Sequence, residues 1–196
     1  SAASDVYKRQ DLYPLTADDG RTLWVYSGAH DMYFVGDFDE NGLYQPIQSV
    51  GQLSYNSQSY AAQTYYYEPG KPVIRFAWNR SDIPGAPFNG SMCTPTEMTL
   101  KKHGDRYYLS ALPIKSTENL VVKSDKLDDF TLTHCTHELG SKTCRISFTV
   151  KEGDLTCNLY GLEMKLDKNG LTCGESILPR LKNEPMKVDI LSLIHI

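Results

Sequence analysis

The sequence predicts an all-β protein built of short strands and many turns. Its apolar residues alternate with polar ones in short runs, the period of a half-buried strand, and no stretch long enough for a stable helix shows a period of 3.6. The chain holds 14 Gly, 10 Pro and 13 Tyr among 196 residues, a composition typical of sheets joined by tight turns. This pattern favours a propeller or a sandwich over an architecture of alternating strands and helices.

The apolar runs are expected to form strands in the order 23–26, 32–35, 60–67, 73–78, 98–100, 107–112, 144–150 and 155–162. Gly, Asn and Asp gather between them, because these residues adopt the backbone conformations of tight turns. The clearest turn signals lie at 17–20, 39–42, 68–70, 103–105, 151–154 and 167–170. The segment around 116–121 is the candidate for a short helical connector.

The two ends of the chain have complementary codings. Residues 5–10, DVYKRQ, can be encoded by GATGTGTATAAGAGACAG, and residues 191–196, LSLIHI, by its reverse complement, CTGTCTCTTATACACATC. These strings resemble the end of a transposon-based sequencing adapter, and residues 1–4 fit the bases that precede it. We therefore expect residues 1–10 and 191–196 to be adapter-derived, and residues 11–190 to be an interior piece of a longer protein.

Charge and hydropathy argue against two kinds of partner. The formal net charge is −4, with 20 Lys and Arg against 24 Asp and Glu, and no basic cluster marks a nucleic-acid footprint. No apolar run approaches the ~18 residues that a membrane-spanning helix needs. We expect neither nucleic acid nor a membrane as a partner.

The five cysteines predict neither a disulfide framework nor a metal site. Their number is odd and no Cys-x-x-Cys pair occurs. The stretch His134-Cys135-Thr136-His137, with Cys144 beyond it, contains the ligand types that zinc uses. In a strand, however, residues 134 and 137 point to opposite faces, so an ordinary half-exposed strand is favoured and no metal ligand is assigned.

Local catalytic motifs such as a nucleophile elbow, a phosphate loop or His-Glu-x-x-His are absent from the sequence. The order of short motifs is more informative. It runs WVYSGA at 24–29, YFVGDFD at 33–39, YAAQT at 60–64, FAWNR at 76–80, PFN at 87–89 and MCTPTEMTL at 92–100. With these motifs in this order, residues 24–120 resemble glycoside hydrolase family 32, the invertase, inulinase and levanase group.

The resemblance implies a fold and a division into domains. Residues 11–112 would form the last two blades of a five-bladed β-propeller, and residues 113–190 the first part of an incomplete C-terminal β-sandwich. It further implies a parent enzyme that cleaves β-fructosyl linkages in sucrose or in a fructan such as levan or inulin, without a metal or organic cofactor.

The resemblance also implies that the catalytic carboxylates lie upstream of this chain. The family's acid/base is a Glu in a Glu-Cys-Pro-Asp-Leu motif, and the sequence DLYPL at 11–15 looks like its continuation. That Glu would then lie three residues before Asp11, where this chain has Lys8. The family's nucleophile and its transition-state-stabilising Asp lie further upstream, so no catalytic residue is assigned here. Glu97, the remaining tempting carboxylate, matches a Glu of structural character.

Three residues are expected to contribute to the sugar pocket. Gln58 and Tyr60 lie in QSYA at 58–61, which would open the fifth blade and face the central funnel. The family often has Asp or Asn at the position of Gln58, and this departure puts its role in doubt. Trp78 matches an aromatic near the funnel, where an indole face suits a sugar ring, and packing between blades is an equal alternative.

Two interpretations of function therefore remain. In the first, the chain is a piece of a fructan- or sucrose-cleaving glycosidase and is inactive on its own. In the second, it is a piece of a propeller that binds carbohydrate without cleaving it, since a fold does not fix a function. The residues immediately upstream of Asp11 would distinguish them.

We predict that residues 1–10 and 191–196 have no counterpart in the parent gene. The test is recovery of the same gene from an independently prepared library. Finding either terminal sequence unchanged in that library would contradict the adapter origin.

Overall fold

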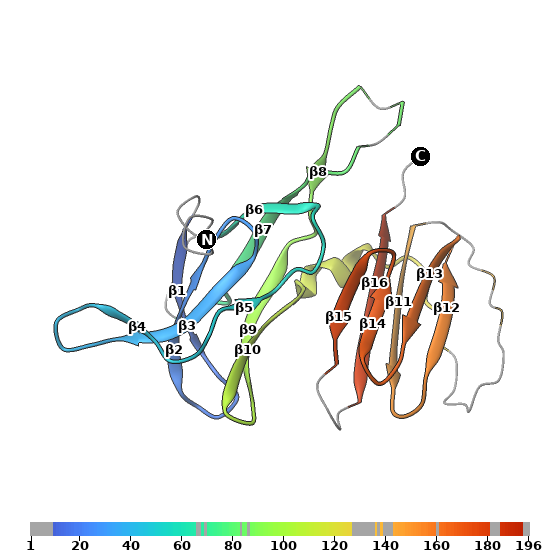
Figure 1. Cartoon of the computed structure of the whole chain (residues 1–196). Coiled ribbons are helices and arrows are strands. Elements are labelled where there is room, and N and C mark those ends of the chain that lie inside the picture. Colours follow the sequence, from blue (N-terminus) through green and yellow to red (C-terminus); the bar gives the residue numbers. More distant parts are fainter. Residues whose placement is uncertain are drawn as a thin grey trace. The chain divides into compact units, whose positions relative to one another are not determined.

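The computed structural model describes residues 10–65, 68, 70–82, 84–85, 87–126, 136, 138, 143–159, 161–180 and 185–193. Nearly all regular structure in them is β (Figure 1), which confirms the predicted all-β class. The short helical connector predicted around 116–121 is a 3-10 helix, η1 (Lys115–Leu120). Within these described ranges no helix is long and apolar enough to span a membrane. The chain divides into two compact units, residues 1–122 and 123–196.

The first unit begins with an antiparallel sheet, here called sheet A. Its strands are β1 (Asp11–Thr16), β2 (Thr22–Ser27), β3 (Met32–Phe38) and β4 (Tyr44–Pro46) in that order, with β5 (Gly51–Gln52) paired to β3. The turn between β1 and β2 closes with a hydrogen bond from Gly20 N to Ala17 O, and Gly20 has φ +84°. A glycine adopts this left-handed conformation without a steric penalty, which is why the Asp18-Asp19-Gly20 signal predicts the turn.

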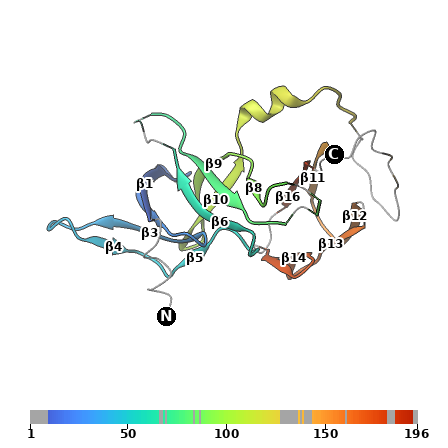
Figure 2. The ribbon, with the colours of Figure 1, turned by 90° about the horizontal axis from the view of Figure 1, so that it is seen from above.

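The second sheet of this unit, sheet B, is also antiparallel and five-stranded. Its strands run in the order β10 (Arg106–Pro113), β9 (Thr96–His103), β7 (Ile74–Asn79) and β6 (Ser59–Thr64), and β8 (Ser91–Met92) pairs with β7. Figure 2 shows the two sheets from above. The run 60–67 was expected to be one strand, but β6 ends at Thr64 and contains a bulge between Tyr60 and Gln63.

Sheets A and B share one hydrophobic core. The alternating side chains on their facing surfaces are buried together: Tyr13, Leu15, Leu23, Val25, Tyr33 and Val35 from sheet A, and Val73, Met98, Leu100, Tyr107 and Leu109 from the second half of the unit. The period-2 pattern of the sequence therefore marks the faces of the two sheets that pack against each other.

The second unit consists of two further sheets. One pairs β11 (Thr143–Val150) with β16 (Met186–Leu193), and the other runs β12 (Leu155–Leu159), β13 (Leu162–Leu166), β14 (Gly170–Cys173) and β15 (Ser176–Pro179). Among its described residues, Met164, Leu166 and Val188 are buried and apolar. Strand β16 continues through residues 191–193, because alternating apolar residues extend a strand whatever their origin. The adapter origin of this end stays a prediction.

Candidate functional site

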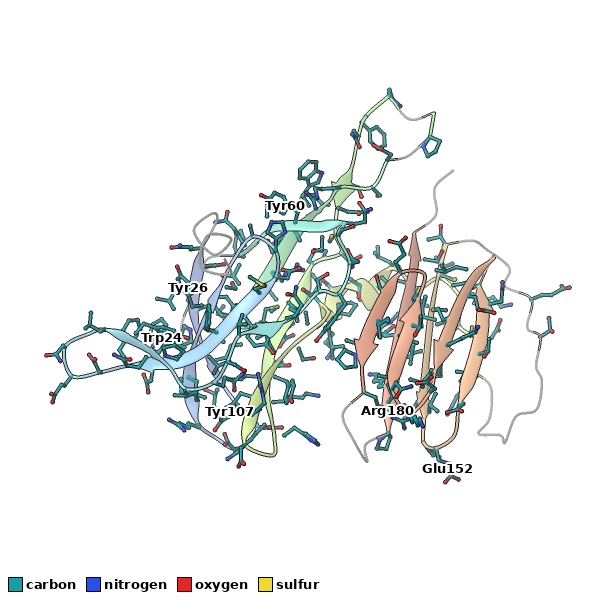
Figure 3. All side chains as sticks on the ribbon, in the orientation of Figure 1. Trp24, Tyr26, Tyr60, Tyr107, Glu152 and Arg180 are labelled. Atoms are coloured by element: carbon teal, nitrogen blue, oxygen red, sulfur yellow. The ribbon has the colours of Figure 1, made fainter. Side chains whose placement is uncertain are left out.

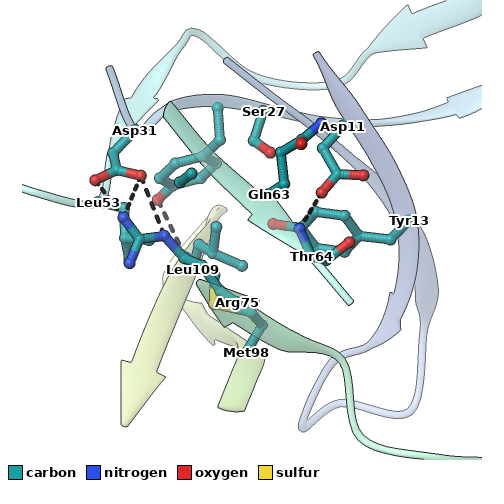
Figure 4. Close-up of a pocket in the computed structure, with 12 residues that line it drawn as sticks. Asp11, Tyr13, Ser27, Asp31, Leu53, Gln63, Thr64, Arg75, Met98 and Leu109 are labelled. Atoms are coloured by element: carbon teal, nitrogen blue, oxygen red, sulfur yellow. Dashed lines mark hydrogen bonds and ion pairs between the residues drawn. The ribbon is translucent and has the colours of Figure 1, made fainter. Parts of the chain in front are cut away.

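The candidate site lies where β6 crosses the end of sheet A at which β1 begins. Three contacts fix this crossing. Thr64 N donates a hydrogen bond to the Asp11 carboxylate (Figure 4), Ala61 N donates to Ala29 O at 2.9 Å, and Ser59 Oγ donates to Asp31 Oδ2 at 2.9 Å. Strand β6 is therefore joined along its length to sheet A, through Asp11 on β1 and through Ala29 and Asp31 in the turn before β3.

A buried ion pair lies at the centre of this crossing. The Arg75 guanidinium donates to both carboxylate oxygens of Asp31, with Nη2 2.6 Å from Oδ1 and 2.6 Å from Oδ2 and Nε 3.2 Å from Oδ1. Asp31 is 3% exposed and Arg75 8% exposed. Because Asp31 belongs to the turn before β3 and Arg75 to β7, the pair connects the two sheets (Figure 4).

A small cavity adjoins the ion pair. It measures about 10 Å³ and is lined by polar and apolar groups of both sheets, including Asp11, Tyr13, Gln63 and Met98 (Figure 4). That volume has room for about one water molecule and none for a sugar ring. Burial raises the pKa of Tyr13, which lines this cavity together with Gln63 and Thr64 of β6, so its hydroxyl is a neutral hydrogen-bonding group.

The structure brings two of the three expected sugar-binding residues together. Tyr60 on β6 (Figure 3) is the register partner of Trp78 on β7, and their ring centroids are 6.5 Å apart. Trp78 is 43% exposed. Gln58 is exposed and lies immediately before β6, where its carbonyl accepts a hydrogen bond from Arg80 N at 2.9 Å. All three residues thus lie around the beginning of β6.

Two neighbours of Tyr60 were not identified from the sequence. The His30 ring lies 4.9 Å from the Tyr60 ring, and the Arg80 guanidinium lies over that ring at 4.5 Å. Arg80 Nη2 also donates to Ser57 O, which holds the guanidinium in place. His30 comes from the turn before β3 and carries no motif of its own, whereas Arg80 ends the FAWNR motif at 76–80 and could have been found there.

A close backbone approach shapes the surface beside Trp78. Gly90 has φ +74°, and a Cβ at this position would lie 2.3 Å from Trp78 Nε1. Only glycine therefore leaves space for the indole at this point. The half-exposed indole of Trp78 thus lies beside a backbone position that carries no side chain.

Three carboxylates of the first unit have identified partners or positions. Asp11 and Asp31 are engaged by Thr64 and Arg75, and Glu97 lies on β9 opposite Leu112 and Ile74. Position 8, where the acid/base was expected, lies outside the described residues.

Metal ligation was not expected, and the relevant stretch is only partly described. Among the described residues no group of three His, Cys, Asp or Glu side chains is placed to hold an ion. His134, Cys135 and His137 lie outside that part of the chain.

Comparison with known proteins gives one family. The model of the glycosyl hydrolases family 32 N-terminal domain matches residues 11–111. A fructan beta-fructosidase of Streptococcus mutans is 27% identical over 136 residues, which cover 56% of this chain and 9% of that protein. The chain thus spans only a small part of this curated relative.

Solved structures with a similar fold include two enzymes. A family 32 beta-fructofuranosidase of Bombyx mori superposes with a TM-score of 0.50 at 16% identity, over 92% of this chain and 41% of that one. The exo-inulinase of Aspergillus awamori gives a TM-score of 0.49 at 19% identity, over 77% of this chain and 31% of that one. At 16% identity the first likeness shows a shared fold alone.

The ion pair yields a prediction about stability. Asp31→Asn leaves the Arg75 guanidinium buried without a carboxylate, so the free energy of unfolding of the first unit should fall by about 3–5 kcal/mol. Urea unfolding followed by tryptophan fluorescence measures it, because both tryptophans, Trp24 and Trp78, belong to this unit.

Lys102→Met is the matched control in the same unit. Lys102 pairs with Asp19 at 3.3 Å, but the Lys102 and Asp19 side chains are 44% and 26% exposed, so the urea midpoint should change little. Equal effects of the two substitutions would contradict a special role for the buried pair.

Proposed function

The chain belongs to glycoside hydrolase family 32, and from this premise we propose that it is a piece of a retaining glycosidase that acts on β-fructosyl linkages. The observation that carries the proposal is the match of the family model to residues 11–111, which covers all but the last two residues of sheets A and B. The substrate would be a fructan such as levan or inulin, or sucrose. The named activity of the Streptococcus mutans relative supports this class of substrate.

We assign residues 11–112 to the last two blades of a five-bladed propeller and residues 113–190 to the first part of a sandwich. Two meanders of four strands that pack face to face support the first assignment. The outer face of sheet B supports it too. Ile74, Phe76 and Trp78 alternate on that face, and Leu112 joins the same row across β9 at 43% exposed. A further blade would cover this face, on which Glu97 is the residue between Ile74 and Leu112.

The proposed mechanism needs two carboxylates that this chain does not supply. A retaining glycosidase places an acid/base and a nucleophile roughly 5–5.5 Å apart, so that one protonates the leaving oxygen while the other attacks the anomeric carbon. The acid/base would precede Asp11 by three residues. Since Asp11 is bound by Thr64, this Glu would enter at the end of sheet A that β6 crosses, on the side where β6 ends.

The residues around β6 would bind the fructosyl unit. Gln58 offers an exposed amide that can both donate and accept hydrogen bonds with sugar hydroxyls. Tyr60 and Trp78 offer aromatic faces, and the exposed indole suits contact with a sugar ring. Packing of Trp78 against a neighbouring blade is the alternative role, because its face of sheet B is also the one that a blade would cover.

One prediction of the proposed function concerns catalysis. The 196-residue chain should release no fructose above background, because proton donation alone contributes ~10²–10⁴-fold and the covalent route also requires the nucleophile. The same chain extended upstream with its natural sequence should place Glu-Cys-Pro directly before Asp11. It should release fructose from sucrose or from a fructan, as measured by a reducing-sugar assay.

The control is the extended chain with Gln in place of that Glu, which should lose most of its turnover and keep its fold. Turnover by the 196-residue chain would show that the active site is misplaced. An upstream sequence without the Glu would favour a propeller that binds carbohydrate without cleaving it.

Another prediction of the proposed function concerns Trp78. In the extended enzyme, Trp78→Ala should weaken fructosyl binding by ~1 kcal/mol or more, the loss of one aromatic contact, and steady-state kinetics would report it as a higher KM. Trp24→Phe is the control, since Trp24 packs on Phe38 within sheet A. Unchanged kinetics with a lower Tm for Trp78→Ala would assign Trp78 to packing.

A further inference from the structure

The backbone at the beginning of β6 is held in a costly conformation. Ala61 has φ +53° and Asp31 has φ +60°, and in the described part of the chain these are the non-glycine residues with positive φ. A left-handed conformation is unfavourable for an alanine and persists only where its neighbours impose it. The two residues lie on either side of the same crossing, since Ala61 N donates to Ala29 O, two residues before Asp31.

The strain coincides with the bulge in β6. Tyr60 pairs with Trp78 and Gln63 pairs with Phe76, so β6 advances by three residues while β7 advances by two. A bulge bends a strand and turns the side chains before it relative to those after it. Here it separates the beginning of β6, with Tyr60, from the end that is bound to Asp11.

The Ser59 hydroxyl connects this strained segment to the buried ion pair. It donates to Asp31 Oδ2 and accepts from Arg75 Nη2, each at 2.9 Å, and so bonds to both members of the ion pair. The Cys93 thiol also interacts with Ser59, and burial raises its pKa, so that it remains a neutral thiol. Ser59 lies between Gln58 and Tyr60, the two residues expected to face the sugar.

We propose that Ser59 is a positioning residue, which transmits the fixed geometry of the Asp31–Arg75 pair to Gln58 and Tyr60 and thereby sets the aromatic surface of Tyr60 and Trp78. The position of Tyr60 affects Trp78, because the two rings form an aromatic pair. That the oriented surface receives a fructosyl unit rests on the proposed function. The orientation itself is a property of this chain.

The second unit contains a chemically matched control. Ser147 Oγ donates to Asp189 Oδ1 at 3.0 Å, and Arg145 binds the same carboxylate through Nε at 2.9 Å and Nη2 at 2.6 Å. This Ser-Asp-Arg set lies on the regularly paired strands β11 and β16, without a bulge. Removal of the Ser147 hydroxyl therefore takes away a Ser–Asp hydrogen bond of similar length in the unit that contains neither Tyr60 nor Trp78.

The first test uses the 196-residue chain and its two indole N–H signals in a proton–nitrogen correlation spectrum. Ser59→Ala should shift the Trp78 signal and leave that of Trp24 in place, whereas Ser147→Ala should move neither, and Ser59→Thr should restore the Trp78 signal. Ser59→Cys, of nearly equal volume, is used if the Ala variant does not fold. A folded Ala or Cys variant with an unmoved Trp78 signal would overturn the proposal.

The second test uses the extended enzyme. Ser59→Ala should raise KM for sucrose or inulin by roughly five- to tenfold, the ratio that corresponds to about one net hydrogen bond, with a smaller change in kcat. Ser59→Thr should restore KM. A lower Tm with unchanged KM would reduce Ser59 to a structural role and overturn the inference. An extended enzyme without fructosidase activity would refute the proposed function, and the indole signals would still decide the positioning role.

Discussion

The arrangement of the first unit depends on one pair of charges placed where water does not reach. Removing a carboxylate and a guanidinium from water costs several kcal/mol for each ion, and this cost is recovered only if their hydrogen-bond geometry is good. The bidentate contact of Arg75 with Asp31, completed by Ser59, supplies that geometry. Apolar packing would accept many small displacements of one sheet on the other, whereas this contact accepts very few.

Directional bonds at the edges of the unit add to the same constraint. The Gln48 side chain donates to Tyr107 O and accepts from Tyr107 N, each at 2.8 Å, so its amide takes the place of a neighbouring strand along β10. The Tyr107 hydroxyl in turn donates to Asp19 in the first turn of sheet A, at 2.8 Å. The Arg21 N–H first, and then this hydroxyl, lower the pKa of Asp19. Both sheets are thus joined at their margins by bonds that tolerate little sliding.

The sequence predicts the strands of this fold better than the junction between them. Alternation at 23–26, 32–35 and 73–78 predicts β2, β3 and β7, because the period of two is a local property. It does not predict that β6 stops at Thr64 with a bulge before it. The causes are partners such as Asp31 and Arg75, 44 residues apart, which leave no local pattern. His30 likewise carries no local pattern, whereas the family motifs name Tyr60 and Trp78, whose role in sugar binding stays a prediction.

The junction makes physical sense if the proposed chemistry is correct. Displacing a substrate by about 1 Å from its reactive geometry can reduce the rate by ~10²-fold. In the proposed enzyme the acid/base precedes β1, whereas the sugar-binding residues begin β6. The position of one relative to the other is therefore set by the contacts that join β6 to β1 and to the turn before β3. Those contacts are the Asp11–Thr64 bond, the Ala61–Ala29 bond and the Ser59 network. An enzyme that must hold its substrate this accurately gains from the strained Ala61 and the buried Asp31–Arg75 pair. Each of them excludes arrangements in which β6 is displaced relative to sheet A.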